Sequence, residues 1–141
     1  MAVSFQNDKI KFTLKDKSKI RKWVNAIILG EKKKKGQINF VFTSDETLLE
    51  MNKKYLKHDT YTDILTFDYS EGKIIGGDVI ISVERVKENA AKFKTNFEEE
   101  LRRVMIHGIL HLCGYKDKTK ANSLKMRKQE DLALKIYKFV S

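Results

Sequence analysis

The sequence predicts an α+β fold in which helices pack on one mixed sheet of about four strands. Four strand-like segments come early in the chain, and helix patterns dominate the later part. No repeat, low-complexity tract or proline divides the 141 residues, a length typical of one domain. Apolar residues make up 41% and charged residues 34%, which is too much core material for a disordered chain. We therefore expect a single domain over residues 1–141.

The predicted strands are short segments rich in β-branched and aromatic residues. The first covers residues 3–14, where apolar residues recur at mostly period-two spacing. Residues 38–43 form a clear second β run, and residues 64–69 and 78–83 are two more, joined by a segment with three glycines. Between the first two strands, residues 31–36 contain four consecutive lysines. This run is predicted to be a solvated loop, with phosphate contact as the alternative.

The predicted helices begin at residues suited to capping. Ser18 is expected to cap a helix that ends at Gly30 and has Trp23 among the apolar residues on one face. A second helix is expected over residues 45–55. Ser82 is expected to cap a third, which runs to about residue 93, and Asn96 with Glu99 gives a capping-box signature for a fourth. The last helix is predicted over about residues 119–140.

The charge and the single cysteine indicate a compartment and a class of partner. Lysine and arginine total 29 against 19 acids, which gives a net charge of +10. This excess favours a polyanionic partner, contacted mainly through its phosphates, although surplus lysine also serves solubility. One cysteine, Cys113, suits a reducing compartment, and no segment has the ~18 apolar residues of a membrane span or the pattern of a signal peptide. We expect a cytoplasmic protein with no membrane partner.

The segment 104–113 carries the chemistry. Every residue in it is apolar or glycine except His107 and His111, so the helix is expected to be buried. Four residues apart, the two histidines differ by about 40° in azimuth and ~6 Å in rise, so they share one stripe. Because a buried imidazole without partners is costly, a shared metal ion is the natural partner of this pair.

Gly114 and Asp117 follow the second histidine at regular spacing. Glycine readily adopts the left-handed conformation that ends a helix and turns the chain back. Such a turn would bring Asp117 toward the imidazoles as a third ligand, leaving a fourth position for water, as in catalytic zinc sites. The alternative is that Asp117 is a turn or capping residue ahead of Thr119. In that case the third ligand would have to come from elsewhere, for example from His58.

The spacing overlaps a metallopeptidase signature that differs at one decisive position. There, a glutamate follows the first histidine and acts as the general base. Here that residue is Gly108, which cannot transfer a proton. A peptidase would need a base from elsewhere, such as Glu100, although Glu100 is better explained by the helix dipole.

Three motifs together resemble the YbeY endoribonucleases, also called rRNA maturation factors. The segment 107–115, HGILHLCGY, is similar to the metal motif of this family, and TDILTF at 62–67 and GGDVII at 76–81 resemble its other two motifs. The resemblance covers the chain from about Asn39 to the end. It implies a zinc-dependent RNase, specific for single strands, that trims ribosomal RNA near the small ribosomal subunit. DNA is not expected as a partner.

Two residues depart from the family pattern. Asp117 stands where the family usually has a third histidine, and its harder oxygen ligand would let Mn²⁺ or Mg²⁺ compete with Zn²⁺. Leu56 stands where the family usually has an arginine. Lys57 and His58 are our candidates to stabilise the extra phosphate charge in its place, with a solvated loop as the alternative for His58. Asp63 is expected either to orient a site residue or to cap a turn.

Two other functions remain open from the sequence. A basic assembly factor could bind ribosomal RNA or a ribosomal protein without cleaving RNA, with zinc as structural support. A small metallopeptidase is the third hypothesis, disfavoured by Gly108 and by the net charge of +10.

Overall fold

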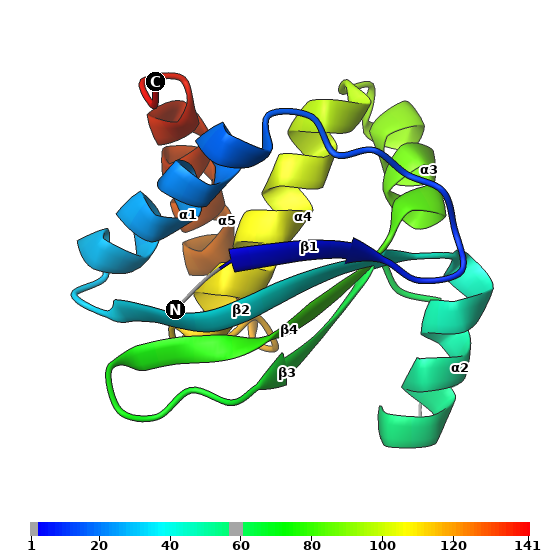
Figure 1. The fold of residues 1–141 in the computed structure, drawn as a ribbon, viewed down its shortest axis with the longest axis horizontal. Coiled ribbons are helices and arrows are strands. Elements are labelled where there is room, and N and C mark those ends of the chain that lie inside the picture. The colour runs from blue at the N-terminus through cyan, green and yellow to red at the C-terminus, as the bar shows by residue number, and fades with distance from the viewer. Residues whose placement is uncertain (1–2, 57–60) are drawn as a thin grey trace.

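The computed structural model describes residues 3–56 and 61–141, and it confirms the predicted α+β fold with a mixed sheet (Figure 1). The elements in chain order are β1 (Val3–Asn7), α1 (Lys17–Gly30), β2 (Lys34–Thr43), α2 (Asp45–Leu56), β3 (Ile64–Asp68), β4 (Ile74–Ser82), α3 (Val83–Phe93), α4 (Phe97–Leu112) and α5 (Lys120–Tyr137). The described strands form one sheet in the order β1-β2-β4-β3. β1, β2 and β4 run parallel, and β3 pairs antiparallel with β4 at the edge.

The two faces of the sheet are covered differently. α1, α4 and α5 lie together over one face, and they bury the main apolar cluster against side chains such as Phe40, Val79 and Ile81 (Figure 1). Side chains alternate across a strand, so Ile80 points to the other face. There it packs with Leu48 of α2 and Leu65 of β3 in a smaller cluster. α4 is therefore the central helix of the larger layer.

The N-terminal part departs from prediction. β1 ends at Asn7, not at residue 14, because Lys9 adopts a positive φ of 60° and takes the chain out of the sheet. Phe12 and Leu14 still contact the core from the following loop, which explains their strand-like apolar spacing. α1 begins after Asp16, so Ser18 lies inside the helix, and Asp16 makes no side-chain cap bond.

The lysine run and β4 also differ from prediction. β2 begins at Lys34, so half of the four consecutive lysines belong to a strand that pairs with Ile74 and Ile75. Correspondingly, β4 begins at Ile74, four residues earlier than expected. Pairing with β2 overrides the weak strand propensity of lysine and glycine here.

Two predicted caps, Ser82 and Asn96, are present, and Thr119 caps the last helix close to its expected start. Ser82 accepts a hydrogen bond from the backbone N–H of Arg85, Asn96 accepts one from Glu99, and Thr119 accepts one from Asn122. Each satisfies a donor that the first turn of a helix leaves open. Within the described residues, none of the helices has the length and apolar character needed to cross a bilayer.

Candidate metal centre

α4 is buried along most of its length, as its sequence predicts. It begins at the Asn96 cap, and three glutamates in the first turn complement the positive end of its dipole. Its buried positions include Met105, Ile106 and Ile109, which are fully enclosed by the sheet and the neighbouring helices. This packing fixes the helix that carries both histidines.

Gly108 allows α4 to approach β4 closely. A Cβ atom at this position would lie 2.7 Å from Cγ1 of Val79 and 3.0 Å from Cδ1 of Ile64. Both distances are too short for an ordinary carbon contact. Position 108 therefore faces the sheet and has no room for a glutamate side chain. The general base of the metallopeptidase signature is thus excluded by packing, in addition to being absent from the sequence.

His107 and His111 point to the same side of α4. Their Nε2 atoms lie 3.0 Å apart, and their ring centroids are 4.6 Å apart at nearly perpendicular planes. Both side chains are partly buried. The four-residue spacing thus brings the lone-pair atoms of the two imidazoles to one point, as the sequence predicts.

The turn after α4 brings Asp117 to the same point. Gly114 has a φ of 108°, and the N–H groups of Gly114 and Tyr115 donate back to the carbonyls of His111 and Leu110. These bonds close the helix in the manner of a glycine C-cap. The Oδ2 atom of Asp117 then lies 3.2 Å from Nε2 of each histidine. The cap of α5 is Thr119, so Asp117 does not serve as that cap.

The three atoms form a triangle that suits a tetrahedral metal ion. Its sides measure 3.0, 3.2 and 3.2 Å. Ligands at 2.0–2.1 Å in a tetrahedral zinc site are separated by about 3.3–3.4 Å. A small relaxation would therefore place an ion at bonding distance from all three. Of the described residues, these form the one group of three or more metal-ligating side chains.

The other ring nitrogen of each histidine, Nδ1, makes a hydrogen bond to an acceptor. Nδ1 of His107 donates to Oε2 of Glu130 at 2.6 Å, and Nδ1 of His111 donates to the carbonyl oxygen of Tyr115 at 3.0 Å. A proton on each Nδ1 leaves each Nε2 as a lone pair directed at the triangle. Metal-binding histidines are generally oriented by such partners. In their neutral forms, both imidazoles therefore present Nε2 to the triangle.

Glu130, which contacts a candidate metal ligand, was not identified from the sequence. It lies on α5, is 5% exposed, and accepts a hydrogen bond from Arg103 at 3.0 Å. Burial opposes protonation of His107, but the hydrogen bond and the charge of Glu130 outweigh it and raise the pKa of the imidazole. One signal was available: Glu130 is four residues after Met126 and four before Leu134, on the apolar stripe of its helix.

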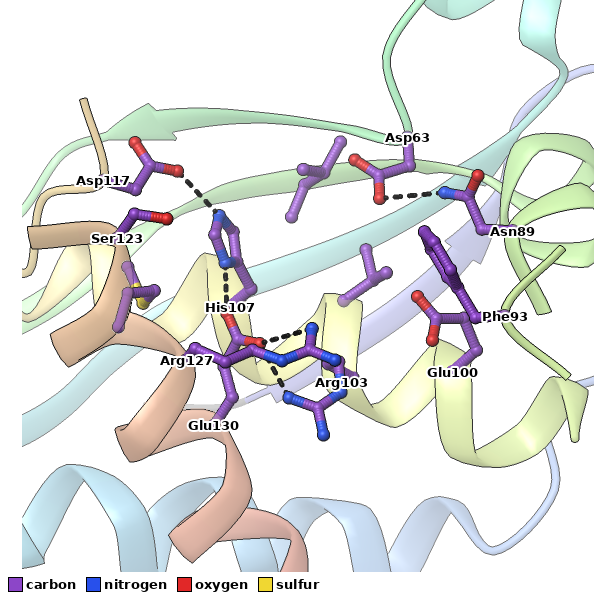
Figure 2. A pocket seen from close by; sticks show the side chains of 13 residues that line it. Asp63, Asn89, Phe93, Glu100, Arg103, His107, Asp117, Ser123, Arg127 and Glu130 are labelled. Carbon is purple, nitrogen blue, oxygen red and sulfur yellow. Dashed lines mark hydrogen bonds and ion pairs between the residues drawn. The ribbon is translucent and has the colours of Figure 1, made fainter. Parts of the chain in front are cut away.

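A cavity of about 410 Å³ opens beside the triangle, and Figure 2 shows the residues that line it. His107 and Asp117 belong to its wall at one end. Asp63, Asn89, Phe93 and Glu100 gather at the other end, and Arg127 lies near Glu130 on the α5 side. The cavity therefore joins the candidate metal centre to a second group of polar side chains.

Of the three predicted catalytic residues, the structure describes Asp63. Asp63 lies directly before β3 and lines the cavity, where Nδ2 of Asn89 donates to it at 3.4 Å. Burial is the main reason that the pKa of its carboxyl is raised. The charge of Asp63 acts on His107, where it helps to raise the pKa of the imidazole. Lys57 and His58 lie outside the described residues.

The fold and the site define an α+β protein with a candidate three-ligand metal centre on its central helix. The chain belongs to the family "Endoribonuclease YbeY", whose model matches residues 2–138. It is 53% identical over 135 residues to an endoribonuclease YbeY of Flavobacterium psychrophilum, covering 96% of each chain. A Bacteroides fragilis relative of the same name is 46% identical over 138 residues, which cover 98% of this chain and 99% of the relative.

A solved structure has a similar fold. The solution structure of TM1509 from Thermotoga maritima matches with a TM-score of 0.66 and 26% sequence identity. The match covers 96% of this chain and 88% of that protein.

Proposed function

We propose that this protein is a metal-dependent endoribonuclease that hydrolyses single-stranded RNA and acts in ribosomal RNA maturation at the small ribosomal subunit. The observation that carries the proposal is the triangle of His107, His111 and Asp117 beside an open cavity, in a chain whose relatives are named endoribonucleases. The net charge of +10 supports a polyanionic substrate. The proposal places the protein in the cytoplasm, as one domain over residues 1–141.

In this proposal His107, His111 and Asp117 hold one divalent ion. Two nitrogens and a carboxylate oxygen suit zinc, while the oxygen would let Mn²⁺ or Mg²⁺ compete. Such an ion supplies a Lewis acid for the scissile phosphate and an activated water at neutral pH. Glu130 and the carbonyl of Tyr115 accept hydrogen bonds from the Nδ1 atoms, so each neutral imidazole would offer its Nε2 lone pair to the ion.

Cations near the cavity would contact the phosphates of the substrate. Arg103 is engaged by Glu130 and Asp131, whereas the Arg127 side chain is 64% exposed, with Glu130 at 3.7 Å. Arg127 is therefore the more available of the two guanidinium groups that line the cavity. Lys57 and His58 remain proposed partners of the scissile phosphate, and Asp63 a proposed orienting group at the cavity wall.

Single-turnover cleavage of end-labelled RNA tests the proposal. Purified protein loaded with one equivalent of Zn²⁺ should cut single-stranded RNA, with little cleavage of duplex RNA or of DNA. Chelation should stop the reaction, and Zn²⁺ or Mn²⁺ should restore it. His111→Ala should remove cleavage, while His58→Ala tests whether His58 contributes. RNA binding without cleavage under all metals would instead indicate an assembly factor, and cleavage of casein would indicate a peptidase.

A further inference from the structure

The end of the cavity away from the metal triangle is built around a buried acid. Glu100 is only 8% exposed, and its carboxylate faces the cavity (Figure 2). The described residues form no hydrogen bond or ion pair with this carboxylate, although the charges of Arg103 and Arg127 in the same cavity wall act to lower its pKa. Burial is the main cause of its raised pKa, as it is for Asp63 in the same wall. A desolvated carboxylate facing an open cavity is a position for a ligand that donates hydrogen bonds.

Glu100 is too far from the metal triangle to act on the reacting phosphate. It precedes His107 by seven residues, which is two helical turns and about 10 Å along α4, on nearly the same side of the helix. One cavity nevertheless contains both residues. A ligand with a phosphate at the triangle could therefore extend along α4 until another part of it meets Glu100.

The chemistry of this end selects a nucleobase over a phosphate. Glu100 and Asp63 would repel a phosphate. The nearby walls include the apolar side chains of Ile64 and Val104, which suit a flat ring. Phe93 is 58% exposed, and Figure 2 shows its ring beside Asn89 and Glu100. Unpaired RNA bases are commonly recognised by stacking on an aromatic ring together with hydrogen bonds to their edges.

We propose that this end of the cavity is a guanine subsite, in which Glu100 accepts from the base, Asn89 donates to it and Phe93 stacks on it. Guanine carries an imino N–H beside an amino group, two adjacent donors that match one carboxylate, and an O6 acceptor that matches an amide N–H. The other three bases lack this pair of donors. The inference rests on the proposed function, since it assigns a nucleotide preference to the same active site.

Binding of the four ribonucleoside 5′-monophosphates tests the subsite without relying on cleavage. The full-length protein is titrated with each nucleotide by NMR or calorimetry, with Zn²⁺ and after chelation. GMP should bind about tenfold more tightly than AMP, CMP or UMP, the scale of one well-formed bidentate contact. Glu100→Gln should abolish this preference, and Phe93→Ala should weaken all four nucleotides alike.

Glu99→Gln is the matched control, because Glu99 lies in the same helical turn but is exposed to solvent. It should retain the GMP preference. If Glu100→Gln does not fold, Asn89→Asp supplies a second test, since it replaces the donor to O6 by an acceptor and should lower GMP affinity selectively. Equal affinities for the four nucleotides, no binding of any, or a GMP preference that survives Glu100→Gln would overturn the subsite.

Two further results separate this inference from the function on which it rests. Tighter binding of arginine amide than of GMP would show that the acidic end takes a cationic side chain, which overturns the subsite. A wild-type protein that prefers GMP through Glu100 but cuts no RNA would contradict the endoribonuclease proposal and leave the subsite standing. If the protein cuts RNA without base preference and binds the four nucleotides equally, the subsite is contradicted and the endoribonuclease proposal stands.

Discussion

Oε2 of Glu130 on α5 lies 2.6 Å from Nδ1 of His107 on α4. This contact joins the last helix of the fold to a candidate metal ligand. Arg103 in turn donates to Oε1 of Glu130 at 3.0 Å, so the acid is held from both sides while being almost completely buried. A buried carboxylate is unfavourable unless it is paired. The pairing seen here therefore fixes both the tautomer and the orientation of the imidazole.

Replacing Glu130 by glutamine should weaken metal binding by about 10–100-fold, the usual effect of losing such a partner. The amide oxygen can still accept from Nδ1, but it brings no negative charge to the imidazole. Competition with a chromophoric chelator measures the Zn²⁺ affinity. Asp131→Asn is the matched control, because Asp131 binds Arg103 at 2.7 Å but makes no contact with a histidine. Equal Zn²⁺ affinities of Glu130→Gln and Asp131→Asn would show that Glu130 is purely structural.

Asp117→Ala should reduce Zn²⁺ affinity by roughly 100-fold or more, since a direct ligand contributes more than a supporting group does. Asp117→His should recover most of this loss, because an imidazole nitrogen also binds zinc at about 2.0–2.1 Å. It should also shift the preference from Mn²⁺ toward Zn²⁺, since nitrogen is the softer ligand.

Lys116→Ala changes the adjacent residue in the same turn and should leave metal affinity unaltered. Metal content and affinity are measured by mass spectrometry and chelator competition, with circular dichroism to verify folding. An Asp117→Ala protein that retains wild-type affinity would show that the third ligand lies elsewhere.

The candidate ligands could be predicted from sequence because their geometry is local. His107, His111 and Asp117 lie within eleven residues, and helical periodicity together with the Gly114 turn determines how they meet. Glu130 could not be placed in the same way. Its contact with His107 depends on how α5 packs against α4, which no local pattern specifies.

The difference between local and long-range contacts also explains which parts of the fold could be predicted. Ser82 and Asn96 could be predicted as caps because a cap bond spans only three residues. The start of β2 at Lys34 was missed because strand formation there depends on pairing with β4, a segment about forty residues later. The polar end of the cavity likewise brings together side chains from three elements of the chain.

Gly108→Ala should destabilise the protein, even though alanine favours a helix by about 1 kcal/mol over glycine. The new methyl group would lie 2.7 Å from Cγ1 of Val79, a stiff and fully buried side chain. Overpacking of this kind costs about 1–3 kcal/mol, so the net loss should be roughly 1 kcal/mol. Urea denaturation measures it. Gly30→Ala, with no atom within 4 Å of its added carbon, should leave stability unchanged or slightly raised.

Glu100→Gln should stabilise the protein at neutral pH. Burial raises the pKa of this carboxyl above its ordinary value of 4.5, so the folded state holds the proton more tightly than the unfolded state does. The stability of the wild type therefore falls as the pH rises from 4.5 through the raised folded pKa, and the full cost of the buried charge remains above it. Glutamine does not ionise and avoids this cost.

Thermal melts should give a higher Tm for Glu100→Gln at pH 7, with the advantage shrinking toward pH 4. Glu99→Gln removes a charge from the same helical turn without relieving burial, so it should show only the small loss of a helix-dipole contact. A Glu100→Gln Tm at or below that of Glu99→Gln at pH 7 would contradict the assignment of Glu100 as a desolvated acid.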